Sequence, residues 1–249
     1  MKQRCKRRFN ANAACHAPPV TLAFHSVGLD LSGQPILRGL DLALAPGAWT
    51  FLLGPPGAGK TTLLRLAAGE IAPTSGRIER SGAGVFAHHS MPLDDTKFSR
   101  DIVAEAMPGA DAMQHAESLL RDLGLETYLG HEPFRLSRGH RARLAIARSV
   151  AAEPALLCLD DPFSPMDRRA KLLTANVLNR AADEKGLAIL MASNNPLDAL
   201  RYADRIAILS AGPAATIVET IAHEPTPEAG DDELAALDLF ARLWRALDG

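Results

Sequence analysis

The hydrophobic pattern alternates between short apolar runs and longer segments with helical spacing. In the first quarter of the chain, apolar runs typical of strands are separated by Gly, Pro and Asp turn signals. A helical pattern over Thr61 to Ala68 follows them, and Pro73 to Gly76 then turns the chain. The expected strands are Val20 to Phe24, Ile36 to Leu44, Trp49 to Leu53, and short ones around Ile78 and Val85.

The pattern changes near Met91. From residue 91 to about 152 the apolar residues recur at helical spacing, including a helix expected over Ala142 to Val150. Strand and helix patterns then alternate over residues 155–159, 171–182, 187–191, 197–202 and 205–209. This order predicts an α/β fold in which helices wrap a parallel sheet, with a helical insertion at 91–152. We expect residues 212–230 to form a loop and residues 231–247 a terminal amphipathic helix.

A glycine-rich motif lies between the third strand and the first helix. Residues 54–61 read Gly-Pro-Pro-Gly-Ala-Gly-Lys-Thr and match G-x-x-x-x-G-K-[ST]. Glycines let backbone N–H groups converge on phosphate oxygens, and the helix N-terminus adds its positive dipole end. Lys60 can then reach the β- and γ-phosphates, and the Thr61 hydroxyl can ligate Mg²⁺. The predicted nucleotide-binding residues are Gly54, Pro55, Pro56, Gly57, Ala58, Gly59, Lys60, Thr61 and Thr62.

A pair of carboxylates ends a later strand. The apolar run from Leu156 is followed by Asp160 and Asp161. A carboxylate at the C-terminal end of a parallel strand, beside a phosphate-binding loop, is placed to hold Mg²⁺. Asp160 is therefore the predicted metal ligand, and Asp161 is predicted to polarise an attacking water. The alternative is two surface aspartates that cap a helix, since Pro162 follows.

Composition adds few restrictions. Of the 249 residues 47% are hydrophobic and 22% charged, which is ordinary for a globular protein, and the formal charge of -2 argues against a nucleic-acid partner bound through a broad basic surface. No run of about 18 apolar residues predicts a membrane span. The three cysteines, Cys5, Cys15 and Cys158, lack metal-ligand spacing, and Cys158 in its apolar run is expected to be a buried, reduced thiol.

The first residues are strongly basic. We expect residues 1–19 to form a flexible basic tail, with attraction to anionic lipid or nucleic acid as the alternative. The absence of a long apolar segment after the basic cluster argues against a secretory signal. The basic residues are Lys2, Arg4, Lys6, Arg7 and Arg8.

The order of the motifs resembles that of the ATP-binding subunits of ABC transporters. Leu136 to His140 is similar to the L-S-G-G-Q signature of that family, and Phe163 to Asp167 to its D-loop. Asp204-Arg205 and Leu209 to Pro213 are similar to the nitrate, taurine and sulfonate importers. The resemblance covers residues 20 to about 219.

The resemblance implies a P-loop NTPase with a RecA-like parallel sheet core, an antiparallel β-subdomain and a helical signature subdomain. The ATP-binding domain would span residues 20–220, followed by a C-terminal loop and helix over 221–249. In this family two cassettes stack head to tail around ATP and Mg²⁺, so Ser137 and Gly139 would contact the γ-phosphate held by the partner. The partner would be an identical or a homologous subunit.

The resemblance also implies a cellular role. The chain would hydrolyse ATP to drive a separate membrane permease, as a peripheral subunit on the cytoplasmic face of the inner membrane, and a periplasmic solute-binding protein would be a further partner. Importer-type function is favoured. Similarity to cytochrome c maturation exporters around Ala87 to His89 leaves export open. The permease and any solute-binding protein choose the transported substrate, so this subunit does not reveal it.

Several positions depart from the family pattern. Asp161 stands where a glutamate is usual, and Asn194 stands at the position of the switch histidine. His88 or His89 aligns with the Q-loop glutamine; His89 is narrowly preferred and could ligate the metal or position a water. Arg138 in the signature could add positive charge opposite the γ-phosphate or hinder closure of the dimer.

The departures predict reduced turnover in a site whose catalytic residues are Asp161, His89 and Asn194. Leu31 stands near the place of the usual adenine-stacking aromatic residue, which puts adenine selectivity in doubt. The alternative is a catalytically impaired nucleotide-binding subunit with a structural or regulatory role in an ABC complex. A soluble ABC protein of DNA repair or translation is less favoured, because those proteins usually carry two cassettes or large insertions.

Overall fold

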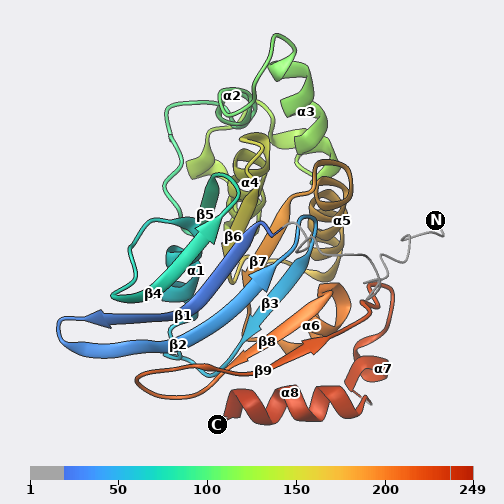
Figure 1. Cartoon of the computed structure of the whole chain (residues 1–249). Helices are drawn as coiled ribbons and strands as arrows, with labels where there is room; N and C mark the ends of the chain where they lie inside the picture. Colours follow the sequence, from blue (N-terminus) through green and yellow to red (C-terminus); the bar gives the residue numbers. More distant parts are fainter. Residues whose placement is uncertain (1–19, 236, 249) are drawn as a thin grey trace, which may run out of the picture.

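The strands form two sheets. A computed structural model describes residues 20–235 and 237–248, so the expected basic tail over residues 1–19, with Cys5 and Cys15, lies outside the described part. The antiparallel sheet has the order β2-β1-β4, and the larger sheet has the order β5-β6-β7-β3-β8-β9 (Figure 1). The smaller sheet contains β1 (Leu22–Leu31), β2 (Gln34–Leu44) and β4 (Ser75–Arg80). The larger contains β3 (Trp49–Leu53), β5 (Gly84–His88), β6 (Leu156–Asp160), β7 (Ala188–Ala192), β8 (Arg205–Leu209) and β9 (Ile217–Ala222).

The larger sheet is parallel except at one edge. Strands β5, β6, β7, β3 and β8 pair in parallel, and β9 pairs antiparallel with β8. Strand β3 has both faces buried: Trp49 and Phe51 pack into the core on one face and Leu52 into the core on the other. A strand covered on both faces needs a continuous apolar run, which explains why its bounds are those expected from sequence.

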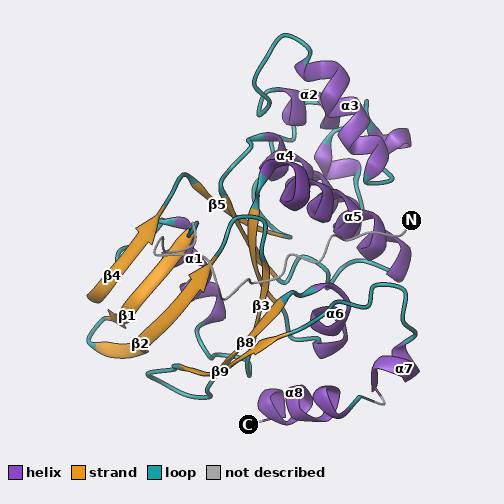
Figure 2. Cartoon of the chain, turned by 45° about the vertical axis from the view of Figure 1, so that its right-hand side comes forward, coloured by secondary structure: helices purple, strands orange, loops and turns teal. Residues whose placement is uncertain are grey.

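Helices cover both faces of this sheet. On one face of the larger sheet, helix α1 (Lys60–Ala68) packs together with the antiparallel sheet. On the opposite face of the larger sheet lie α5 (Arg168–Lys185) and α6 (Pro196–Tyr202). Figure 2 shows the antiparallel sheet at the left and a separate group of helices at the top. That group comprises α2 (Ser99–Ala104), α3 (Ala112–Asp122), η1 (Glu126–Tyr128), η2 (Pro133–Arg135) and α4 (Arg138–Ala151).

The predicted helical insertion therefore forms its own small core. Leu120 and Leu144 are fully buried there, beside Val103. Helix α4 connects the two cores, because Leu144 points into the insertion while Ile146 packs against the main sheet. The amphipathic pattern of the insertion and the second apolar face of α4 explain why the insertion stays attached to the sheet.

The C-terminal expectations need correction. Residues 212–230 were expected to be a loop, but they contain β9, an edge strand whose side chains are mostly exposed and therefore lack a clear apolar pattern. The single terminal helix is instead two helices, α7 (Asp231–Ala235) and α8 (Asp238–Asp248). Leu234 and Leu243 anchor them in the core of the main sheet.

The first strand is longer than expected. Strand β1 continues past Phe24 to Leu31, and its register with β2 shifts between Phe24 and Val27. Ser26 at this bulge has a φ of 48°, so the regular inside–outside alternation restarts one step later. Among the described helices, none is long and apolar enough to cross a membrane.

Candidate nucleotide-binding site

The glycine-rich loop connects the carboxyl end of β3 to α1. Gly57 and Gly59 have φ values of 81° and 82°, in the left-handed region that favours glycine. A Cβ on Gly59 would lie 2.9 Å from Cδ2 of Leu37, so a larger residue would also have to displace the end of that side chain. Pro56 and Gly57 are exposed, whereas Ala58 is buried against the core. The loop is therefore packed against the core on one side and exposed to solvent on the other.

Lys60 lies across this loop. Its Nζ donates to the carbonyl oxygens of Gly54 at 2.5 Å and Pro55 at 3.0 Å. Burial lowers the pKa of Lys60, while the charges of Asp160 and Asp161 oppose that shift. The ammonium group is thus bound to the loop carbonyls within reach of the charges of the two carboxylates, where a triphosphate would need a positive charge.

Thr61 and Asp160 meet although 99 positions separate them: the Thr61 hydroxyl donates to Oδ2 of Asp160 at 2.6 Å. A hydroxyl and a carboxylate are hard oxygen donors, the kind that Mg²⁺ prefers, so the residues present fit this ion. Bound there with a nucleotide, Mg²⁺ would neutralise charge on the phosphate oxygens. Within the described residues, no group of three or more His, Cys, Asp or Glu side chains could hold a metal.

Asp161 occupies an unusual backbone conformation. Its φ is 44°, and its N–H donates to the carbonyl of Ala192 at the end of β7 at 3.0 Å. Burial raises the pKa of the Asp161 carboxyl, the neighbouring Asp160 raises it further, and His89 opposes the shift. A carboxylate with a raised pKa is a better acceptor for a proton from water, so Asp161 can serve as a general base.

The two candidate histidines differ in their surroundings. His88 lies at the end of β5, and its Nδ1 is 3.0 Å from Oγ of Ser90. Nδ1 of His89 is buried and has no hydrogen-bond partner in the described part of the chain. The charge of His89 is among those that act on the Asp161 carboxyl, so His89 lies close to the carboxylate pair.

Asn194 follows β7, which lies between β6 and β3. Its side chain is exposed. The preceding residue is tied to the central strand, since the N–H of Ser193 donates to the carbonyl of Leu52 at 3.2 Å. Asn194 is therefore placed at the carboxyl edge of the sheet, between the strand that leads to Asp160 and the strand that leads to the loop.

The signature residues form a separate cluster. Ser137 is the N-cap of α4, and its Oγ accepts the N–H of His140 at 3.3 Å. A Cβ on Gly139 would lie 2.6 Å from the carbonyl oxygen of Pro165, so only glycine allows this close approach to the segment after Asp161. The structure brings together the loop, Asp160, Asp161 and His89, and it places Ser137 and Gly139 against the D-loop segment.

Two residues of the signature cluster were missed by sequence reasoning. The ring of Tyr128 packs on that of His140, with centroids 4.3 Å apart. Arg143 is only 8% exposed and donates to the carbonyls of Leu123 at 2.6 Å and Gly139 at 3.4 Å. A charged residue within the apolar pattern of α4 was the available signal for Arg143, whereas no local pattern marks Tyr128.

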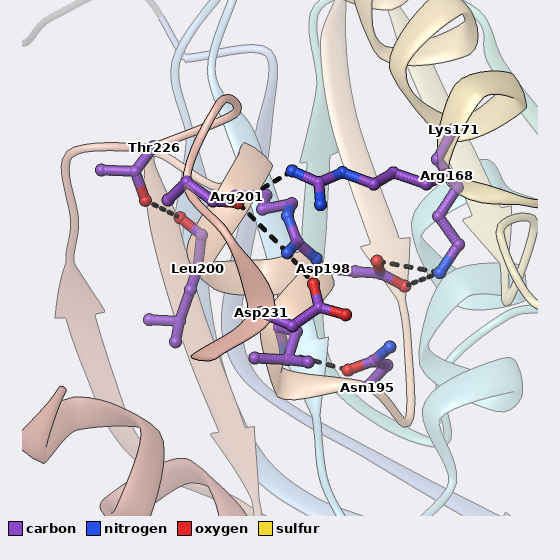
Figure 3. A network of polar contacts seen from close by, with 10 residues as sticks. Arg168, Lys171, Asn195, Asp198, Leu200, Arg201, Thr226 and Asp231 are labelled. Atoms are coloured by element: carbon purple, nitrogen blue, oxygen red, sulfur yellow. Dashed lines mark hydrogen bonds and ion pairs between the residues drawn. The ribbon is translucent and has the colours of Figure 1, made fainter. Parts of the chain in front are cut away.

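A network of polar contacts joins α5, α6 and the segment before α7 (Figure 3). Nζ of Lys171 on α5 lies 2.9 Å and 3.0 Å from the carboxylate oxygens of Asp198 on α6, whose side chain is 3% exposed. Arg201 connects α6 to the C-terminal segment through Asp231 and the carbonyl of Ala229. These contacts join the helices that begin just after the D-loop and just after Asn194.

The comparison with protein families decides the assignment. A family model described as "ABC transporter" matches residues 37–164. The chain belongs to this family. The match contains the glycine-rich loop, the paired carboxylates and the signature segment, so the family expected from those motifs is confirmed.

Curated relatives have related descriptions. An aliphatic sulfonates import ATP-binding protein of Pseudomonas fluorescens is 36% identical over 181 residues, which cover 73% of this chain and 70% of the relative. An Fe(3+) ions import ATP-binding protein of Rhodococcus jostii is 32% identical, with coverage of 80% of this chain and 62% of the relative. A sulfate/thiosulfate import ATP-binding protein of Caulobacter vibrioides is 32% identical, with coverage of 78% and 63%. The chain thus spans less than two thirds of the length of the last two.

Solved structures confirm the fold class. An ATP-binding subunit of an ABC transporter superposes with a TM-score of 0.73 at 22% identity, covering 90% of this chain and 99% of that one. A dimeric ATP-binding cassette in a post-hydrolysis state, bound to ADP and Pi, gives 0.71 at 20% identity, covering 82% and 99%. The predicted P-loop NTPase fold with a parallel sheet core is therefore correct.

Proposed function

We propose that this chain is the ATP-hydrolysing, energy-coupling subunit of an import-type ABC transporter. The observation that carries the proposal is the convergence of Lys60, Thr61, Asp160 and Asp161 where β3 and β6 end. Import is supported by the relatives, which are described as import ATP-binding proteins. The chain would act from the cytoplasmic face of the membrane on a separate permease, with a periplasmic solute-binding protein delivering the substrate.

Each residue of the site would have its own role in binding or hydrolysing ATP. The backbone N–H groups of residues 57–62 and the Lys60 ammonium bind the β- and γ-phosphates, and Thr61 and Asp160 hold Mg²⁺. Asp161 accepts a proton from the attacking water, and His89, whose charge acts on the Asp161 carboxyl, would help to position that water. Asn194 donates a hydrogen bond to the γ-phosphate.

Two cassettes would form the working unit. Ser137 and Gly139 lie at the start of α4 and offer a hydroxyl and backbone N–H groups to a phosphate. Within the described part of this chain, Gly139 contacts Pro165 of the D-loop and not the glycine-rich loop. We therefore propose that Ser137 and Gly139 bind the phosphate held by a second cassette, identical or homologous. The similar solved cassette described as dimeric supports this arrangement.

We expect this turnover to be slow. Asp161 is shorter than the glutamate of the family pattern by one methylene, so its carboxylate is withdrawn by about 1.5 Å. A misplacement of about 1 Å can cost on the order of 10²-fold in rate. Asn194, moreover, carries no proton that titrates near neutral pH.

The residues Asp161 and Asn194 also support a second candidate function. A chain that retains Lys60, Thr61 and Asp160 can bind Mg-ATP, while Asp161 and Asn194 leave hydrolysis weak. Such a chain would be a nucleotide-binding structural or regulatory subunit, which ATP binding switches without turnover.

Steady-state phosphate release by the chain assembled with its membrane partners distinguishes the ATPase from the regulatory subunit. Lys60→Ala and Asp161→Asn should both abolish release if the chain is the ATPase, because they remove the phosphate contact and the base. Lys185→Ala, which removes an exposed ion pair with Glu153, is the control and should leave release unchanged. Mg-ATP binding without release, insensitive to Asp161→Asn, would support the regulatory subunit. Absence of Mg-ATP binding by calorimetry would overturn both.

A further inference from the structure

His140 and Ser137 are joined by two hydrogen bonds, one from the backbone and one through the imidazole. Oγ of Ser137 accepts the backbone N–H of His140 at 3.3 Å and lies 3.0 Å from the imidazole Nδ1 of the same residue. The imidazole is held in this position by the ring of Tyr128 in η1, 4.3 Å away between centroids. The side chain at the last position of the signature is therefore fixed against the hydroxyl at its second position.

The direction of the hydrogen bond through the imidazole depends on the proton at Nδ1. A serine hydroxyl has one proton to donate. When Nδ1 carries no proton, the hydroxyl donates to it and has nothing to offer a phosphate. When Nδ1 is protonated, it donates to Oγ, and the hydroxyl proton becomes available to a phosphate oxygen. The imidazolium also adds a positive charge at the start of α4.

Burial and the nearby Arg143 guanidinium favour the neutral form of His140. The pKa of His140 is lowered, first by burial and then by the Arg143 guanidinium one turn along α4. Asp167, at the start of α5, acts in the opposite direction. Tyr128, from η1, is the titratable ring in contact with the imidazole. The neutral imidazole therefore predominates at neutral pH.

We propose that His140 is a positioning residue that controls the proton of the Ser137 hydroxyl, so that the signature offers this donor to a triphosphate mainly when the imidazole is protonated. The proposal rests on the proposed function in one respect, namely that Ser137 meets the phosphate of a partner cassette. It predicts that the apparent affinity for ATP of the paired cassettes increases as the pH falls through the pKa of His140.

The hydrogen bond can be tested without any partner. Two-bond ¹H–¹⁵N spectra of the full chain with labelled histidine, assigned by the signal lost in His140→Gln, report the protonation state of each ring nitrogen. We expect Nδ1 to be unprotonated and Nε2 protonated at pH 8, and the Nδ1 shift to change in Ser137→Ala. A neutral form with its proton on Nδ1, or no change in Ser137→Ala, would overturn the proposal.

The consequence for binding is tested in the assembled transporter. We compare the KM for ATP at pH 8.0 and pH 5.5 in the wild type and in His140→Gln, whose amide does not titrate. Protonation of ATP itself affects both variants equally. We expect the KM of the wild type to fall about fivefold more than that of the variant, with kcat changing similarly in both, since one charge-assisted hydrogen bond is gained.

Equal pH dependence of KM in the two proteins would overturn the inference. Failure of the proposed function has a different result: ATP binding and phosphate release would be absent or unaffected by Lys60→Ala. In that case the histidine spectra alone decide whether the imidazole holds the Ser137 proton.

Discussion

Oγ1 of Thr61 lies 2.6 Å from Oδ2 of Asp160, which connects the first turn of α1 to the end of β6. The two side chains come from elements far apart in the chain, and together they offer the oxygen donors of a magnesium site. Their proximity links the phosphate-binding loop to the neighbouring carboxylate pair.

The magnesium contribution to ATP affinity should depend on this pair. Thr61→Val keeps the shape of the side chain but removes the hydroxyl, so the gain in affinity that Mg²⁺ provides should fall about tenfold, while the affinity for metal-free ATP stays unchanged. Calorimetric titrations with and without Mg²⁺ measure both quantities. Thr220→Val, at an exposed position on β9, is the matched control. Full magnesium enhancement in Thr61→Val would contradict the assignment.

Lengthening the Asp161 side chain should increase turnover. Asp161→Glu returns the carboxylate by about 1.5 Å toward the attacking water, and we expect phosphate release to increase about tenfold or more. Asp160→Glu adds the same methylene to the neighbouring residue but moves the carboxylate from its place beside Thr61, so it should decrease release. If both variants behave alike, Asp161 is not the base.

A methyl group at Gly139 should disturb the D-loop. The added Cβ would lie 2.6 Å from the carbonyl oxygen of Pro165, so the two segments must separate. We expect Gly139→Ala to lower the free energy of unfolding by about 1–2 kcal/mol, despite the better helix propensity of alanine. Gly130→Ala, where a Cβ meets nothing within 4 Å, is the control. Denaturant unfolding of the three proteins measures the difference, and an unchanged midpoint in Gly139→Ala would contradict the contact.

The ion pair of Lys171 and Asp198 should be important for stability (Figure 3). Lys171→Ala leaves the buried Asp198 carboxylate without its partner, and we expect a loss of about 3 kcal/mol at pH 7. The exposed pair of Lys185 and Glu153 should contribute less than about 1 kcal/mol, so Lys185→Ala is the control. Thermal unfolding at pH 7 measures both.

The stability loss in Lys171→Ala should depend on pH. Burial already raises the pKa of Asp198, and Lys171 opposes that shift. A raised pKa in the folded protein means that the ionised carboxylate destabilises the fold as the pH rises through the folded pKa, and the penalty disappears below the unfolded value. Without Lys171 the pKa rises further, so the loss relative to the wild type should shrink between pH 7 and pH 5. A constant loss would indicate that Asp198 is stabilised by other groups.

Strong local patterns predicted most elements of the sheet. The bounds of β3 and β8 agree with the apolar runs of the sequence, because buried parallel strands need uninterrupted apolar residues. Strand β9 and the break between α7 and α8 were not predicted. Both lie at the edge of the fold, where few side chains are buried and tertiary contacts determine the backbone.

The sequence by itself determined the glycine-rich loop and the order of the motifs, because spacing along one chain carries that information, and the resemblance of those motifs to known proteins indicated the family. It also identified Lys60, Thr61, Asp160 and Asp161 as a candidate site. Only the tertiary structure brought His89 close enough for its charge to act on Asp161, and only it showed that the His140 imidazole meets the Ser137 hydroxyl. Such contacts depend on the directions of side chains from different elements, and no periodicity in the sequence specifies those directions.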